Sequence, residues 1–392
     1  TIVNMRTIPY GRQYIDKADI AEAAKALRSD WITQGPKVRE FEDALKRYCG
    51  AKYAVAVSSG TAALHISCLA AGLKKGDEAI TTPITFAATA NSILYAGAKP
   101  VFADIDPQTA NINTQKIIKK ITRRTKAILP VHFAGLPCDI GKICEIARKE
   151  ELVIIEDASH ALGAQYKYKG KWFKVGSCRH SDMVVFSFHP VKAITTGEGG
   201  AVLTNSRAIY NKLLMLRNHG ITKARGKFIN RRFRGLAWYH EMQCLGFNYR
   251  ITDFQCALGI SQLRKINSFL DRRREIAGIY YKEFSNTEGI ELPPHKGNFR
   301  SAWHLYYIRV DSKTSLFNLL RKRGLGVQVH YIPVYLHPYY QMLGYKRGAC
   351  PNAEKFYQNA ISIPLYYSMN NKEVSYVTDT IKKTIKELGK SR

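Results

Sequence analysis

The sequence predicts an α/β fold with a mostly parallel central sheet, flanked by helices and followed by a smaller α+β domain. Over the first two-thirds of the chain, short apolar runs rich in Val, Ile and Phe alternate with amphipathic stretches. Most of these runs are apolar on both faces, which is typical of parallel strands covered by helices on both sides. After Pro293 and Pro294 the pattern restarts as a smaller unit.

The predicted elements follow in order along the chain. The expected strands of the large sheet are Tyr53–Val57, Val101–Ala103, Ala127–Val131, Leu152–Glu156, Met183–Phe188 and Gly200–Leu203. The expected helices between them are Ala62–Ala71, Phe86–Ala96 and Ile140–Glu150. A long basic helical stretch runs from Asp253 through Arg274, and we place a domain boundary within it, dividing a large domain (1–262) from a small C-terminal domain (263–392). The small domain should contain a strand at His304–Val310, a helix at Leu316–Arg323, a strand near Val327–Tyr331 and a closing helix at Lys372–Leu388.

The composition excludes several classes of protein. Of the 392 residues, 45% are hydrophobic and 23% charged, which is globular rather than disordered. No apolar run reaches the roughly 18 residues that span a bilayer, and no signal-peptide pattern is present, so we expect a cytoplasmic protein that does not bind membranes. The eight cysteines form no C-x-x-C pair, so we expect buried thiols and no metal site.

The net charge of +29 suggests an anionic partner. A nucleic-acid-binding protein would carry a clustered basic face with aromatic stacking residues or a groove-fitting helix. The basic residues are instead spread along the chain, and no such motif is present, so we expect no nucleic-acid partner.

Candidate chemistry follows the predicted strands, because ligands bind at the carboxyl ends of parallel strands. Ser58–Ala62 (SSGTA) joins a strand to a helix and could bind an anion, although ordinary helix capping explains it as well. Glu156 and Asp157 are two acids at the end of a buried strand, where carboxylates need a partner or a function, although a helix N-cap and a surface charge explain them as well. Lys192 follows an apolar strand and precedes a glycine-rich turn; it is either an ordinary surface lysine or a lysine in a dry pocket, where the amine becomes nucleophilic.

A fourth segment, Gly246–Arg250, offers Asn248 and Arg250 as ligand contacts or as turn residues. The phosphate site, carboxylate and lysine together are the set that pyridoxal phosphate requires. The first binds its phosphate, the second keeps its pyridine nitrogen protonated, and the third forms the Schiff base.

Nine segments along the chain form a specific pattern: Thr33–Pro36, Ser58–Leu64, Thr81–Asn91, Pro130–Gly135, Glu156–Ala164, Ser187–Ala201, Asn218–Gly220, Gly246–Gly259 and Val329–Tyr335. In this order they match one family, and the chain resembles the DegT/StrS-type sugar-nucleotide aminotransferases, which are fold-type-I pyridoxal-phosphate enzymes. Within the family, PYGRQYI, SHALG and QVHYIPVY most resemble the C4 aminotransferases of pseudaminic acid synthesis.

The resemblance assigns cofactor roles to matching positions. Lys192 would form the Schiff base and later move the proton at the reacting carbon, and Asp157 would pair with the pyridinium nitrogen. His160 would lie near the phenolic oxygen, and Phe86 would stack on the ring. Four residues would hold the phosphate: Gly60, Thr61, Ala62 and Ser187. Asn248 would reach that phosphate from the other subunit of a homodimer.

The resemblance also implies the substrates. Around the sugar nucleotide would lie Tyr10, His189, Arg250, His330 and Tyr331. A lysine at position 192, where dehydratase relatives carry histidine, favours amino transfer. The implied reaction moves the amino group of L-glutamate to C4 of a UDP-linked 4-keto-6-deoxy-N-acetyl-hexose and releases 2-oxoglutarate; another keto-sugar, of the bacillosamine, aminoarabinose or 3-keto type, remains the alternative. The six basic residues within Lys223–Arg234 lie either near the substrate diphosphate or in a solvated loop.

Overall fold

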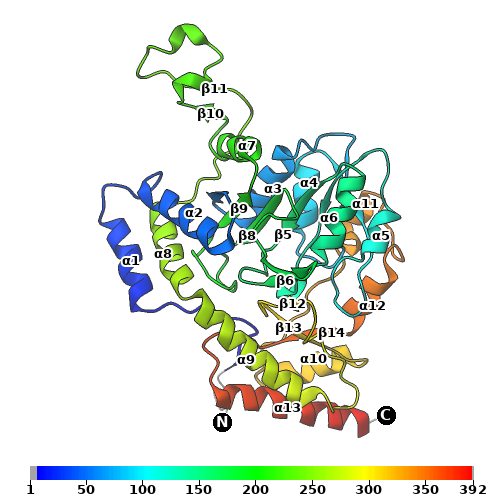
Figure 1. The fold of residues 1–392 in the computed structure, drawn as a ribbon. Coiled ribbons are helices and arrows are strands. Elements are labelled where there is room, and N and C mark those ends of the chain that lie inside the picture. Colours follow the sequence, from blue (N-terminus) through cyan, green and yellow to red (C-terminus); the bar gives the residue numbers. More distant parts are fainter. Residues whose placement is uncertain (1–6, 391–392) are drawn as a thin grey trace.

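The structure is a computed structural model that describes residues 7–390 (Figure 1). Its centre is a seven-stranded sheet with the strand order β1–β9–β8–β5–β4–β2–β3. The strands are β1 (Tyr53–Val57), β2 (Glu78–Thr81), β3 (Lys99–Phe102), β4 (Thr125–Leu129), β5 (Val153–Asp157), β8 (Met183–Ser187) and β9 (Gly200–Thr204). All neighbouring pairs are parallel except the two that β9 makes, with β1 and β8. The predicted mostly parallel sheet is confirmed.

Helices cover both faces of this sheet. One face packs against α3 (Gly60–Ala70), α4 (Ala88–Tyr95) and α7 (Arg207–Arg217). The other packs against α2 (Pro36–Cys49), α5 (Thr114–Ile118), α6 (Ile140–Lys149), α8 (Asp253–Arg264) and the start of α9 (Ile266–Phe284). Successive side chains of each strand point to opposite faces of the sheet and so pack against both layers of helices. In β1, Val55 and Val57 face the first layer, and Ala54 and Ala56 face the second. This explains why the strands are apolar on both sides. Helix α1 (Lys17–Leu27) packs beside α8.

The C-terminal part builds a second core around β13 (Tyr306–Arg309) and β14 (Ala360–Ile363), which pair antiparallel. It also contains α10 (Lys313–Lys322), α11 (Pro338–Met342), α12 (Pro351–Asn359) and α13 (Asn371–Lys390). The strand predicted near Val327–Tyr331 is wrong, because Gln328 makes only an isolated bridge to Ser362. The partner of β13 is β14, which comes later in the chain.

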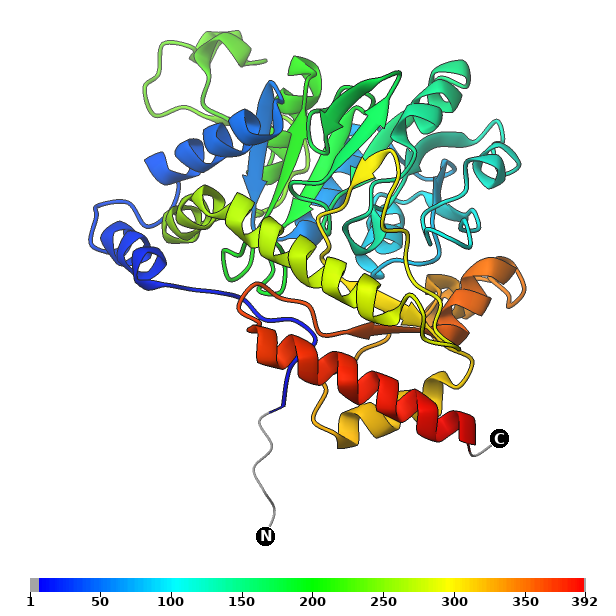
Figure 2. The ribbon, with the colours of Figure 1, turned by 60° about the horizontal axis from the view of Figure 1, so that its bottom comes forward.

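Helix α9 links the two cores: Figure 1 shows it running from α8 toward α13, and Figure 2 shows it lying alongside α13. Its first part, with Phe269 and Leu270, packs under the large sheet, and its second part, with Tyr280 and Phe284, packs in the C-terminal core. The division of the chain at 262/263 lies inside α8 and stays a prediction.

Two smaller sheets complete the fold. One has the order β12–β6–β7, with β12 at Phe299–Arg300, β6 at Gln165–Tyr168 and β7 at Lys171–Lys174. The other pairs β10 (Ile221–Thr222) with β11 (Glu241–Met242) at the base of an arm that projects from the body (Figure 1). We call residues 221–243 the arm. None of the helices within residues 7–390 has the length and apolarity that crossing a membrane requires.

Candidate active site

A tight cradle forms where β1, β8 and β9 meet. Gly200 pairs with Val57 on one side and Ser187 on the other, which brings the end of β8 beside the start of α3. An added Cβ on Gly60 would lie 2.8 Å from the Ser187 Cβ, so only glycine fits there. The Ser59 hydroxyl caps α3 by accepting a hydrogen bond from the Ala62 N–H (3.1 Å). The first turn of α3 and Ser187 therefore surround one point at the helix N-terminus, where anions bind favourably.

Asp157 ends β5 and is 5% exposed. Its Oδ2 accepts a hydrogen bond from the Thr89 hydroxyl (2.7 Å), and its Oδ1 accepts one from the Ser159 N–H (3.1 Å). The Thr85 hydroxyl lies 2.7 Å from that of Thr89 and completes the chain of donors. These contacts hold the carboxylate in one orientation at the carboxyl end of the sheet.

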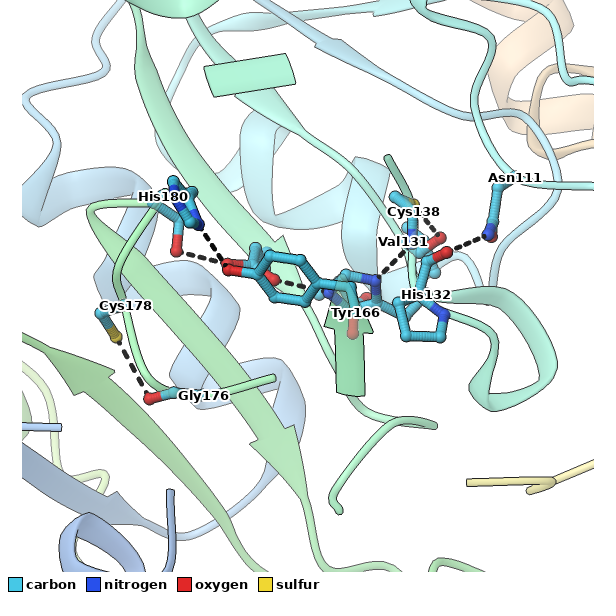
Figure 3. A network of polar contacts seen from close by, with 12 residues as sticks. Asn111, Val131, His132, Cys138, Tyr166, Gly176, Cys178 and His180 are labelled. Carbon is cyan, nitrogen blue, oxygen red and sulfur yellow. Dashed lines mark hydrogen bonds and ion pairs between the residues drawn. The ribbon is translucent and has the colours of Figure 1, made fainter. Parts of the chain in front are cut away.

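Behind Asp157, on the opposite face of β5, lies a buried polar network, part of which Figure 3 shows. The Cys138 N–H donates to His132 Nδ1 (2.9 Å), so the ring proton is on Nε2, which donates to the Glu156 carboxylate (2.6 Å). The Ser181 hydroxyl donates to the other Glu156 oxygen. Since the His132 N–H also donates to the Asp157 carbonyl (3.1 Å), the network braces the backbone of Asp157.

Lys192 lies in the turn after β8, where its N–H donates to the His189 carbonyl (2.9 Å). Burial lowers the pKa of its amine to about 8, and the negative charge of Asp157 opposes this shift. An amine with this pKa carries a substantial neutral fraction near neutral pH, as a nucleophilic lysine requires.

A group of rings lies close to Lys192. His160 is 7% exposed, and its Nε2 lies 3.3 Å from the Tyr331 hydroxyl. Tyr331 also packs against Phe86, whose side chain is 63% exposed, with ring centroids 6.3 Å apart. His330 Nδ1 lies 2.9 Å from the Ser362 hydroxyl, and its ring packs on Tyr10 at 5.3 Å.

Burial, with a further contribution from the Lys192 charge, lowers the pKa of His330 to about 4 and that of His160 well below its usual range. Neither imidazole therefore carries a charge at neutral pH.

Three predicted residues lie apart from these contacts. Asn248 and Arg250 belong to a segment that follows the arm and runs along the outer edge of β1, where the Ser58 N–H donates to the Tyr249 carbonyl (2.9 Å). Asn248 is exposed, and Arg250 donates to Asn218 and lines a cleft of about 790 Å³ beside α2 and α7. His189 belongs to the Lys192 turn, but its side chain is exposed.

Sequence reasoning missed three residues of this region: Thr89, His304 and Arg273. Thr89 lies within a matched segment, but nothing in its local pattern indicated that its hydroxyl would meet Asp157. Arg273 is 2% exposed and donates to the carbonyls of His304 and Leu365 (3.4 and 2.9 Å). Nothing in its basic helical stretch distinguished it from Arg272 and Arg274, which are only partly buried.

Comparison with known proteins identifies the family. Residues 13–382 match the model of the DegT/DnrJ/EryC1/StrS aminotransferase family. The chain belongs to this family. It is a sugar aminotransferase that depends on pyridoxal phosphate.

Three family members show how far the similarity extends. The UDP-4-amino-4,6-dideoxy-N-acetyl-beta-L-altrosamine transaminase of Campylobacter jejuni subsp. jejuni serotype O:23/36 is 41% identical, over 98% of this chain and 99% of that protein. Helicobacter pylori PseC, described as an aminotransferase involved in the biosynthesis of pseudoaminic acid, is 34% identical with a TM-score of 0.89, over 97% of this chain and 100% of that one. The PLP-form of the putative sugar aminotransferase Spr1654 from Streptococcus pneumoniae is 30% identical with a TM-score of 0.89, over 97% and 99%.

The site of this family member fits the cofactor. The Gly60–Ser187 cradle admits no side-chain carbon at Gly60, as a phosphate site built from backbone N–H groups requires. His160 Nδ1 is buried without a hydrogen-bond partner among residues 7–390, which leaves a polar atom for a ligand to satisfy. The lowered pKa of Lys192 suits a lysine that bonds to an aldehyde. The residues present could therefore hold pyridoxal phosphate.

Proposed function

We propose that this aminotransferase moves the amino group of L-glutamate to C4 of a UDP-linked 4-keto-6-deoxy-N-acetyl-hexose. The observation that carries the proposal is a Lys192 amine whose pKa burial lowers to about 8, in electrostatic interaction with a buried, hydrogen-bonded Asp157, in a chain 41% identical to a transaminase of that sugar class. Lysine at position 192 is the residue that amino transfer needs, because it can remove a proton from one carbon and return it to another.

When bound, pyridoxal phosphate supplies an electron sink that stabilises negative charge at the carbon carrying the amino group. Lys192 would hold the cofactor and then move the proton. Asp157 would keep a proton on the pyridine nitrogen, helped by the fixed orientation that Thr89 gives it. The first turn of α3, at Gly60, Thr61 and Ala62, would bind the phosphate together with Ser187.

The aromatic groups would complete the site. Phe86, largely exposed beside Tyr331, would stack on the cofactor ring, and the unpartnered His160 Nδ1 would bind the ring oxygen. Tyr10, His330 and Tyr331 would form the wall of the sugar pocket together with His189 and Arg250. Because His330 stays neutral, it would act there as a hydrogen-bonding group rather than as a cation.

We also propose a homodimer with shared active sites. Asn248 and Arg250 lie at the outer edge of β1, and neither contacts Lys192 or Asp157 in the same chain. The arm projects from the same edge and carries exposed apolar side chains, Ile229 and Trp238, which a second copy could cover. Its basic residues would then approach the diphosphate of a substrate in the partner.

A cytoplasmic location remains part of the proposal. All eight cysteines are free, and seven are buried, as expected for a protein of a reducing compartment.

The substrate is tested with a panel of nucleotide-linked keto-sugars and L-glutamate, with 2-oxoglutarate and the aminated sugar measured by mass spectrometry. We expect the UDP-linked 4-keto-6-deoxy-N-acetyl-hexose to give the highest kcat/KM, and Lys192→Ala to abolish turnover. A higher kcat/KM for a 3-keto sugar or for a different 4-keto sugar would overturn the proposed substrate but leave the enzyme class intact.

Shared active sites are tested by mixing two inactive variants, Lys192→Ala and Asn248→Ala. A heterodimer of the two contains one site with both substitutions and one with neither. Random exchange should therefore restore about a quarter of the wild-type activity. If the mixture stays as inactive as its components while sedimentation shows that subunits exchange, each site is made by a single chain.

A further inference from the structure

His304 lies next to the proposed active site but has no part in the chemistry described above. It precedes β13, is 5% exposed, and packs its ring on that of His160 with centroids 4.3 Å apart and planes at 38°. Aromatic rings in this arrangement attract each other beyond the effect of burial alone. The pair joins the end of the β5 segment to the C-terminal core, 144 residues later in the chain.

The backbone around His304 is unusual and tightly held. Trp303 has a left-handed conformation (φ +47°), and so does Ala134 opposite it (φ +57°). Bulky residues adopt this region only when the surrounding structure enforces it. Here the His304 N–H donates to the Ala134 carbonyl (2.9 Å) and the Ala302 N–H to the Gly135 carbonyl (3.0 Å). A Cβ on Gly135 would lie 2.9 Å from the His160 carbonyl oxygen.

The buried guanidinium of Arg273 also holds this turn. Arg273 of α9 donates to the carbonyls of Trp303 and His304 (both 3.4 Å) and of Leu365 (2.9 Å). Two sets of hydrogen bonds, one to the backbone of Ala134 and Gly135 and one from Arg273, therefore hold the strained turn. In this turn the ring of His304 packs against the ring of His160. Backbone strain of this kind persists only where the surrounding contacts hold it, as they do at Trp303 and Ala134.

On its other side, His160 meets Tyr331, whose hydroxyl lies 3.3 Å from His160 Nε2. Burial raises the pKa of Tyr331, so the phenol keeps its proton and donates it. Nε2 then accepts, and the single proton of a neutral His160 is on Nδ1. Nδ1 is buried without a partner among the described residues and so presents an unused donor.

Every charged group facing the pair favours the neutral form of both rings. Burial is the main reason that the pKa values of His160 and His304 lie well below the usual range, and Lys192 and His330 lower both further. Arg273 adds to the effect on His304. Among residues 7–390, no acidic side chain is hydrogen-bonded to either ring.

We propose that His304 is a positioning residue: its ring holds the ring of His160 so that Nδ1–H points to the oxygen of the cofactor ring. The proposal rests on the proposed function, because it needs pyridoxal phosphate bound beside His160. It assigns His304 no contact with substrate and no proton transfer.

The test compares His304→Leu, which removes the ring, with His304→Phe, which keeps a flat ring without nitrogen. The measured quantities are the Kd for pyridoxal phosphate, the position of its visible absorbance band on the protein, and urea unfolding of the cofactor-free chains. We expect His304→Leu to weaken binding about three- to ten-fold and to move the band, and His304→Phe to restore both to within about two-fold. His180→Leu is the matched control, because the His180 ring also packs against aromatic rings (Phe173, 4.8 Å), but these belong to the β6–β7 sheet.

A second comparison separates positioning from a general loss of structure. If His304 acts through His160, then His304→Leu should have no further effect on the Kd or the band in a His160→Gln background. An unchanged Kd and band in His304→Leu, or equal losses in the Leu and Phe variants, would overturn the proposal. So would fully additive losses in the double variant. A wild-type protein that binds no pyridoxal phosphate would refute the proposed function itself, which is a distinguishable result.

Discussion

Neutralising Asp157 should change how readily Lys192 loses its proton. In the native site burial lowers the pKa of the Lys192 amine from 10.5 to about 8, and the Asp157 carboxylate partly offsets that shift. At pH 7, a pKa of about 8 leaves roughly 10% of the amine neutral, whereas an ordinary lysine is only about 0.03% neutral. The site therefore offers about 300 times more nucleophile. Asp157→Asn removes the offsetting charge and should lower the pKa of Lys192 below 8.

The assay is the initial rate at which pyridoxal phosphate bonds to the cofactor-free protein, followed by absorbance from pH 6 to pH 10. Each rate is divided by that of N-acetyl-lysine amide at the same pH, which cancels the titration of pyridoxal phosphate itself. The normalised rate should be highest at low pH and should decline once the pH passes about 8. Above that pH the Lys192 amine is already mostly neutral, whereas the neutral fraction of the N-acetyl-lysine amide amine still increases, so the ratio of the two rates decreases.

In Asp157→Asn the decline should begin at a lower pH. A normalised rate that stays flat from pH 6 to pH 10 would show that Lys192 behaves as an ordinary exposed lysine. A decline that moves to higher pH in Asp157→Asn would show that the sign of the interaction is wrong. Either result would refute the reasoning from burial and charge.

Three further substitutions test the geometry around this amine. Gly60→Ala places a methyl group 2.8 Å from the Ser187 Cβ. It should lower the free energy of unfolding in urea by about 1–3 kcal/mol and also lower the affinity for inorganic phosphate. An unchanged affinity would contradict the proposed phosphate cradle. Thr89→Val removes a 2.7 Å hydrogen bond to Asp157 and should cost about 1.5–3 kcal/mol, whereas equal unfolding curves would show that water replaces the hydroxyl. Glu156→Ala should destabilise the chain more than Glu156→Gln, by about 1–3 kcal/mol, because it leaves a buried histidine N–H unpaired; the reverse order in thermal unfolding would contradict the network.

Much of the fold could be predicted from sequence patterns among residues that are neighbours in the chain. The alternation of apolar runs, turn residues and helical patterns correctly predicts both ends of the strand Tyr53–Val57 and the first residue of the strand Met183–Ser187. The alternation of apolar runs and helical patterns predicted the sheet, the residues after the strands together with the family segments predicted the cofactor, and the family segments predicted the enzyme class; all three are confirmed. The individual roles of the site residues stay predictions. Sequence patterns failed at β2, a four-residue strand with a polar end (Glu78–Thr81), and at Val327–Tyr331, which meets β14 only through the bridge from Gln328 to Ser362 and forms no ladder.

The sequence by itself determined what depends on neighbours in the chain: the strand–turn–helix units, the glycine of the cradle, and the lysine and aspartate that follow their strands. Only the tertiary structure decided which distant segments meet. The bond from Thr89 to Asp157 joins positions 68 residues apart, and the stacking of His304 on His160 joins two cores. Contacts of this kind arise because packing brings together surfaces that no periodicity relates, so no pattern along the chain marks their residues in advance.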